Sequence, residues 1–271
     1  MRRPLRLPDG WVTDTVRANG ITVRSYQVGA GPPLLFAHGF YENACCRVPI
    51  INALAEQFTV YAYDARGHGH TDAPATGYEM SDRVADMRGV IDALELDKPI
   101  VYGHSMGAAT AAWLATEAEL GGLILEDPAR FADTEPPMGP ADRRRFVHDR
   151  VHEWRSQSLA ERIDALDTAG EQAHRYAVAQ GECDPRIAEL AHAGYPVTSA
   201  AFSDIDCPTL VLKADADDRI RREERQLAAP LDGRLVHIDG AGHSVVHDEF
   251  DAALRTIRSF VSCQHLSYET A

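Results

Sequence analysis

The pentapeptide Gly103-His104-Ser105-Met106-Gly107 decides how this chain is expected to fold. An apolar run, Pro99–Tyr102, precedes it, and an alanine-rich stretch with helical character, Ala108–Glu119, follows it. A Gly-x-Ser-x-Gly motif between a buried strand and a helix is typical of a sharp turn that presents its serine as a nucleophile. Glycine is needed two residues before and two residues after the serine, because larger side chains there would collide with neighbouring backbone. We therefore predict that Ser105 is a nucleophile.

Short apolar runs recur on both sides of this motif, and most of them are followed by a loop and a stretch of helical periodicity. The predicted strands are Trp11–Arg17, Ile21–Gln27, Pro33–Ala37, Phe58–Tyr63, Pro99–Tyr102, Gly121–Glu126, Pro208–Ala214 and Arg234–Ile238. The predicted helices are Ala44–Gln57, Ser81–Leu96, Ser105–Glu119, Ile220–Ala229 and His247–Val261. Strands that alternate with helices indicate a mostly parallel sheet covered on both faces. We expect an α/β fold with eight strands.

The alternation of strands and helices is interrupted once. Residues 129–201 are charged and helical in pattern, and strand patterns resume only afterwards. The simplest interpretation is a helical cap inserted after the sixth strand. The predicted organisation is a core made of residues 1–128 and 202–271, with residues 129–201 as the cap.

Composition limits the partners that this chain can have. Its 271 residues, 45% of them hydrophobic, are enough to bury one sizeable core. The formal net charge of −14 disfavours a nucleic-acid partner, because a phosphate backbone would be repelled. No stretch approaches the roughly 20 apolar residues that cross a bilayer, so we expect no membrane insertion. The composition does not decide whether the chain forms a homo-oligomer.

Cysteine and lysine usage adds two further expectations. The cysteines are odd in number and lack zinc-like spacing, and the basic N-terminus is not followed by an apolar run, so we expect a cytoplasmic protein without a disulfide framework. They are Cys45, Cys46, Cys183, Cys207 and Cys263. Lys98 and Lys213 are the only lysines. An acidic, lysine-poor composition is typical either of a salt-adapted source or of a GC-rich genome.

A serine hydroxyl needs a base that accepts its proton, and the base needs a third group that orients it. His243 is the best candidate base among the twelve histidines. It lies in a loop of small residues directly after the last predicted strand. From that position an imidazole can reach the turn that carries Ser105.

The orienting acid is expected in the loop after the seventh predicted strand. We predict Asp217, which lies three residues beyond the apparent end of that strand, with Asp215 and Asp218 as alternatives in the same loop. Glu126, at the end of an earlier strand, is a separate alternative. We expect Glu126 instead to help Asp127 hold the connection from the strand to the cap.

Two backbone amides are expected to stabilise the negative charge that develops on a substrate oxygen. One is the amide of Met106, directly after the nucleophile. The other is the amide of Phe40, in the loop after the third predicted strand, where Gly39 permits a sharp turn. His38 is an alternative catalytic histidine, but we expect it to pack beneath this loop.

These motifs together resemble the α/β-hydrolase superfamily over nearly the whole chain outside the cap. The resemblance rests on His38-Gly39-Phe40, the segment Tyr63–Asp72, Ser105, the Asp217 loop and His243. The order serine, acid, histidine is the order of that family. The resemblance implies hydrolysis of a carboxylic ester or lactone of a small molecule through an acyl-enzyme, without a cofactor or a metal.

The resemblance leaves other reactions open. Carbon–carbon bond hydrolysis and perhydrolysis use the same triad, whereas the epoxide hydrolases and haloalkane dehalogenases of the family have aspartate in place of Ser105. A ligand receptor with this fold is a further alternative, although a receptor has no need of a strained nucleophile. Turnover of simple esters separates the enzyme from the receptor.

Substrate selection is expected to depend on the cap. Phe40 and Trp154 are the candidate substrate-binding residues. Phe131, Met138 and Phe146 are further apolar side chains that either line a pocket or form the core of the cap itself.

Overall fold

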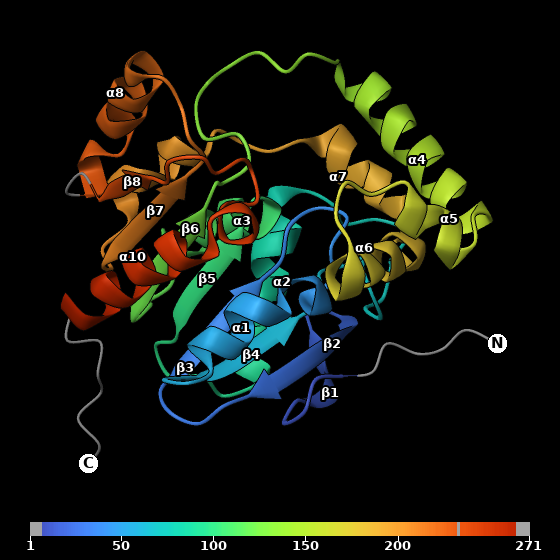
Figure 1. The fold of residues 1–271 in the computed structure, drawn as a ribbon, viewed down its shortest axis with the longest axis horizontal. Coiled ribbons are helices and arrows are strands. Elements are labelled where there is room, and N and C mark those ends of the chain that lie inside the picture. The colour runs from blue at the N-terminus through green and yellow to red at the C-terminus, as the bar shows by residue number, and fades with distance from the viewer. Residues whose placement is uncertain (1–6, 232–233, 264–271) are drawn as a thin grey trace.

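An eight-stranded sheet forms the centre of the molecule in this computed structural model, which describes residues 7–231 and 234–263 (Figure 1). Its strands are β1 (Val12–Ala18), β2 (Ile21–Val28), β3 (Pro33–Ala37), β4 (Thr59–Tyr63), β5 (Ile100–His104), β6 (Gly122–Glu126), β7 (Thr209–Lys213) and β8 (Leu235–His237). Each strand overlaps one of the eight predicted runs. The turn between β1 and β2 has positive φ at Asn19 and Gly20, which is the backbone that these two residue types favour in a hairpin.

The strand order is β1-β2-β4-β3-β5-β6-β7-β8. β2 pairs antiparallel with β1 and β4, and all other pairs are parallel. The predicted α/β fold with a mostly parallel sheet is therefore confirmed. Parallel strands end at the same edge of a sheet, so the loops that follow β3, β5, β6, β7 and β8 come together at one edge.

Helices cover both faces of the sheet because the parallel strands are apolar on both sides. On β3, Leu34 and Phe36 pack under one layer, which contains α1 (Val48–Leu54) and α10 (Phe250–Cys263). Leu35 packs under the opposite layer. That layer contains α2 (Met80–Ala93) and α3 (Met106–Leu114).

The regular elements between β6 and β7 are all helical. They are α4 (Pro140–Ser156), α5 (Leu159–Asp164), α6 (Gly170–Glu182), η2 (Pro185–Ile187), α7 (Ala188–Ala193) and η3 (Thr198–Asp204). A long connection leads from β6 to α4, and α4–α7 gather beside the sheet (Figure 1). The exact division of the chain into core and cap stays a prediction, and η3 crosses its expected boundary between residues 201 and 202.

The predicted helix Ser105–Glu119 is shorter than expected. It begins at Met106 and ends at Leu114. Thr116 donates a side-chain hydrogen bond of 2.8 Å to the Trp113 carbonyl oxygen, and such local bonds compete with the helical pattern. The remaining helices are η1 (Ala44–Arg47), α8 (Asp218–Leu227), η4 (Ala229–Leu231) and α9 (Val245–Asp248). Among the residues described, no helix has the length and apolarity needed to span a membrane.

Candidate active site

Ser105 lies at the turn between β5 and α3 with a strained backbone. Its φ of 49° is a left-handed value that few residues other than glycine adopt. A Cβ on Gly103 would lie 2.4 Å from the Ala108 amide nitrogen, and a Cβ on Gly107 would lie 2.4 Å from the Ala37 carbonyl oxygen. Only glycine fits at these two positions, which is the steric requirement inferred from the motif.

The side chain of Ser105 meets His243, as predicted. His243 Nε2 lies 2.9 Å from Ser105 Oγ, and His243 Nδ1 lies 2.5 Å from Asp127 Oδ2. Since a carboxylate accepts, Nδ1 carries the proton and Nε2 is free to accept the hydroxyl proton of the serine. Serine, histidine and carboxylate thus form one continuous chain of hydrogen bonds.

The structure places Asp217 away from His243, so the predicted contact between them is wrong. Asp217 is the exposed N-cap of α8, where its Oδ1 accepts from the amides of Arg219 and Ile220, both at 2.9 Å. The alternative Asp215 pairs with Arg221. Asp218 is the exposed first residue of α8. A helix start needs acceptors for its free amides, and the loop turns its carboxylates to that purpose.

Asp127 takes the position predicted for Asp217, because of the register between β5 and β6. His104 is paired with Glu126 at the ends of these strands, so the next residues, Ser105 and Asp127, leave the sheet side by side. Asp127 has a positive φ of 39°, which the sequence did not indicate. A carboxylate directly after the strand next to the nucleophile strand was the signal available in the sequence.

Asp127 is held in its ionised form. Burial favours the neutral acid, but the hydrogen bond from His243 and the charge of Lys213 outweigh burial and lower the pKa of Asp127 to about 2. The carboxylate is therefore charged wherever His243 can act as a base.

The two amides predicted to form an oxyanion site come from the residue after Ser105 and from the loop after β3, the strand next to β5. Met106 is the first residue of α3, and the first amides of a helix have no acceptor within the helix. In the described part of the chain, the structure records no hydrogen bond from the Phe40 amide. Both amides are free to donate to a substrate oxygen.

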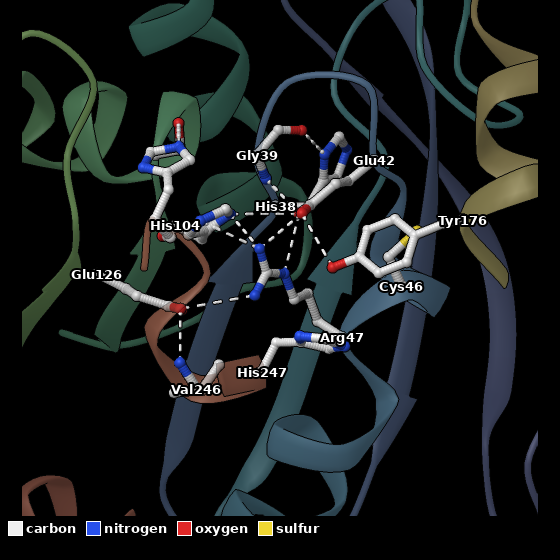
Figure 2. A network of polar contacts seen from close by, with 12 residues as sticks. His38, Gly39, Glu42, Cys46, Arg47, His104, Glu126, Tyr176, Val246 and His247 are labelled. Carbon is white, nitrogen blue, oxygen red and sulfur yellow. Dashed lines mark hydrogen bonds and ion pairs between the residues drawn. The ribbon is translucent and has the colours of Figure 1, made fainter. Parts of the chain in front are cut away.

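The loop that carries Phe40 rests on a buried network of charges, shown in Figure 2. Glu42 Oε2 accepts from the Gly39 amide at 2.8 Å and from Arg47 Nε at 2.9 Å, and Arg47 also contacts His104. Burial opposes ionisation, but Arg47 and His104 hold the pKa of Glu42 well below its usual range. Tyr176 of α6 reaches the same carboxylate at 3.5 Å.

Glu126, the alternative acid, belongs to this network and does not contact His243. It accepts hydrogen bonds from the Tyr102 hydroxyl at 2.9 Å and from the Val246 amide at 3.0 Å. His104 Nε2 donates to the His243 carbonyl oxygen at 3.1 Å. The network therefore supports the backbone at the His243 carbonyl oxygen and at the Val246 amide. Figure 2 shows His104, Glu126 and Val246 within this network.

His38 packs beneath the Phe40 loop, as expected. Its Nε2 accepts from the Ala65 amide at 2.9 Å, and its Nδ1 donates to the Gly39 carbonyl oxygen at 2.7 Å. Burial lowers the pKa of His38 and keeps the imidazole neutral. With both nitrogens engaged, His38 orients the loop.

An apolar cluster joins the helices between β6 and β7 to the nucleophile turn. It contains Met106 and Phe40, together with Tyr41 and Trp154. Tyr41 contacts both Phe40 and Trp154, with ring centroids 4.4 and 4.8 Å apart. The two candidate substrate-binding residues, Phe40 and Trp154, thus belong to one apolar cluster.

The other aromatic and apolar candidates lie elsewhere. Phe131 packs against Phe202 in the core under α3, with ring centroids 5.6 Å apart. Met138 lies in the connection before α4 and Phe146 lies on α4, and both side chains are exposed.

The fold and these contacts define a protein of the α/β hydrolase class. The model of the alpha/beta hydrolase family matches residues 34–256, so the chain belongs to that family.

Individual relatives differ in the reactions that their names describe. The 2-(acetamidomethylene)succinate hydrolase of Mesorhizobium japonicum is 37% identical over 109 residues, which are 40% of this chain and 39% of the relative. A soluble epoxide hydrolase of a Corynebacterium species is 37% identical over 97 residues, 36% of this chain and 34% of the relative. The matches span well under half of these curated relatives.

Among solved structures, an esterase of Exiguobacterium antarcticum superposes with a TM-score of 0.77 and 22% identity. The match covers 93% of this chain and all of that chain. Identity at this level shows a shared fold.

Proposed function

We propose that this protein is a serine hydrolase that cleaves a carboxylic ester or lactone of a small, largely apolar substrate through an acyl-enzyme. The observation that carries the proposal is the chain of contacts from Ser105 Oγ through His243 to Asp127. The partly buried Phe40 and Trp154 pack in one apolar cluster with Met106, the residue after the nucleophile, and this apolar environment supports an apolar substrate.

In the proposed reaction, His243 Nε2 accepts the proton of Ser105 as Oγ attacks the carbonyl carbon. The amides of Met106 and Phe40 donate to the oxyanion, and Asp127 stabilises the imidazolium through Nδ1. His243 then gives the proton to the leaving alcohol. Water, activated by the same histidine, cleaves the acyl-enzyme and restores the serine.

The nucleophile argues against epoxide hydrolysis, despite the epoxide hydrolase among the relatives. Attack of a serine hydroxyl on an epoxide would produce an ether, which water does not cleave under these conditions. Attack on a carbonyl produces an ester, which the same residues can hydrolyse. Ser105 therefore favours a substrate with a carbonyl group.

The test is hydrolysis of p-nitrophenyl acetate, p-nitrophenyl butyrate and a simple γ-lactone by the wild type and by Ser105→Ala. We expect the variant to lose about 10⁴-fold or more in kcat while remaining folded. Equal rates in both proteins, or no turnover of any of the three by the wild type, would overturn the proposal.

An amide substrate is a second candidate, favoured by the similarity to the 2-(acetamidomethylene)succinate hydrolase. The substrate in that name contains an acetamido group, whose carbonyl is open to the same attack. Comparing kcat/KM for p-nitrophenyl acetate and p-nitroacetanilide distinguishes the two: a preference for the anilide would favour amide hydrolysis.

A further inference from the structure

Lys213, the last residue of β7, is a buried cation beside the carboxylate that holds His243. Its Nζ lies 2.5 Å from Asp127 Oδ1, the oxygen that His243 does not use. The Lys213 side chain is only 10% exposed, and its ammonium lies 4.7 Å from the centre of the Phe131 ring. A charge this deeply buried is costly unless it is paired, so the ion pair with Asp127 is a specific feature of the site.

The ion pair continues away from the active site. Glu224 of α8 places Oε1 3.3 Å from Lys213 Nζ, and His237 Nε2 of β8 lies 2.6 Å from Glu224 Oε2. Asp127 faces His243 and Lys213, Lys213 faces Asp127 and Glu224, and Glu224 faces Lys213 and His237. This series of ion pairs thus runs from Asp127, directly after β6, to Glu224 of α8 and His237 of β8. Figure 1 shows β7, β8 and α8 next to one another.

We propose that Lys213 is a positioning residue for the reaction: it holds Asp127 Oδ1, so that Oδ2 stays directed at His243 Nδ1. The proposal rests on the serine hydrolase function proposed above. Asp127 follows its strand in a strained backbone conformation, and its carboxylate could rotate about the Cα–Cβ and Cβ–Cγ bonds. An ammonium fixed at one oxygen removes that freedom, while Glu224 limits how much of the lysine charge acts on Asp127.

The lysine content of the chain allows a direct test of the contact. Lys98 and Lys213 are the only two lysines, and Lys98 is 58% exposed in an ion pair with Glu119. In a Lys98→Arg protein labelled with 13C-lysine, a single lysine Cε signal remains, and it belongs to Lys213. We expect Asp127→Asn to shift that signal and Asp217→Asn to leave it unchanged.

Kinetics test the consequence for the reaction. Lys213→Met keeps an unbranched side chain that is one atom shorter and removes its charge, and we expect kcat for p-nitrophenyl acetate to fall about 10- to 100-fold with little change in KM. Without the ammonium, the pKa of Asp127 rises, because the charge of Lys213 contributes to lowering it. Lys213→Arg should recover part of kcat, and Lys98→Met should behave as the wild type.

The outcomes separate this proposal from the proposed function. A folded Lys213→Met protein with the kcat of the wild type, or a Lys213→Arg protein with no more kcat than Lys213→Met, would overturn the positioning role. An unchanged Lys213 signal in Asp127→Asn would overturn the contact itself, and this measurement needs neither a substrate nor a folded Lys213 variant. If the wild type hydrolyses no ester, the proposed function fails, while the NMR result still decides whether Lys213 holds Asp127.

Discussion

Asp127 and Asp217 provide a matched pair of substitutions, because only one of the two carboxylates contacts His243. Asp127→Asn leaves the shape of the site intact but removes the acceptor that holds His243 Nδ1–H. We expect kcat for p-nitrophenyl acetate to fall by about 10⁴-fold, the effect of the same change in other serine triads. Steady-state kinetics at pH 7.5 measures it.

Asp217→Asn is the control for that substitution. Asparagine caps a helix about as well as aspartate, so α8 should remain stable and kcat should stay close to that of the wild type. A large loss of kcat in Asp217→Asn, with little loss in Asp127→Asn, would contradict the acid assigned from the contacts.

Asp127 should also make stability depend on pH. Its pKa is about 2 in the folded protein and 3.8 in the absence of interactions, so its ionisation stabilises the fold above pH 4 and this stabilisation is lost as the pH falls towards 2. We expect the ionisation of Asp127 to contribute about 2 kcal/mol to the free energy of unfolding at pH 5, of which about 1 kcal/mol is lost by pH 3.

Urea unfolding of the wild type and of Asp127→Asn at both pH values measures this difference. The stability gap between the two proteins should narrow as the pH decreases, because asparagine does not titrate. A gap of constant size between pH 5 and pH 3 would show that the pKa of Asp127 is not lowered.

At the level of strands and loops, the parts of the site that the sequence predicted are those specified locally. Ser105 follows from a five-residue motif, and His243 follows from a loop after the last strand. The acid was not specified in this way, because several carboxylates follow β6 or β7. The choice depends on the β5–β6 register and on Lys213, both of which are properties of the assembled sheet. The strands, like Ser105 and His243, were predicted well because their signal is local: burial on both faces of the sheet leaves a continuous apolar run in the sequence.

The loop between β3 and α1 depends on the buried pair of Glu42 and Arg47, which gives a prediction about stability. Glu42→Gln would leave the Arg47 guanidinium in the interior without its principal partner, with Glu126 more distant at 3.6 Å. We expect the free energy of unfolding to fall by about 3–5 kcal/mol. The Gly39 amide would also lose a charged acceptor, so kcat should decrease through the Phe40 loop.

A matched surface substitution checks this prediction. Glu117 forms an exposed ion pair with Arg88, with both side chains more than 40% exposed. Glu117→Gln should change the free energy of unfolding by at most about 1 kcal/mol. Urea unfolding measures the free energy of unfolding of Glu42→Gln and Glu117→Gln. Similar decreases in both variants would mean that burial does not strengthen the Glu42–Arg47 pair.

For the whole molecule, the dominant electrostatic property is the formal net charge of −14. Like charges repel one another most strongly in the compact state, so screening them should stabilise the fold. The Debye length falls from about 30 Å at 0.01 M salt to about 10 Å at 0.1 M and about 3 Å at 1 M. Salt screens buried pairs such as Glu42–Arg47 much less than it screens surface charges. The change in stability with salt concentration therefore reports on the surface charges.

We therefore expect the Tm to rise steeply as NaCl increases from 0.01 M to about 0.3 M, and then to level off as the Debye length falls below the spacing of surface charges. Thermal unfolding followed by circular dichroism at constant pH measures the curve. A rise that continues in proportion to salt up to several molar would instead indicate a surface adapted to concentrated salt, since screening is complete well before that range. A Tm that falls with the first additions of salt would mean that attractive surface pairs outweigh the net repulsion, despite the excess of carboxylates.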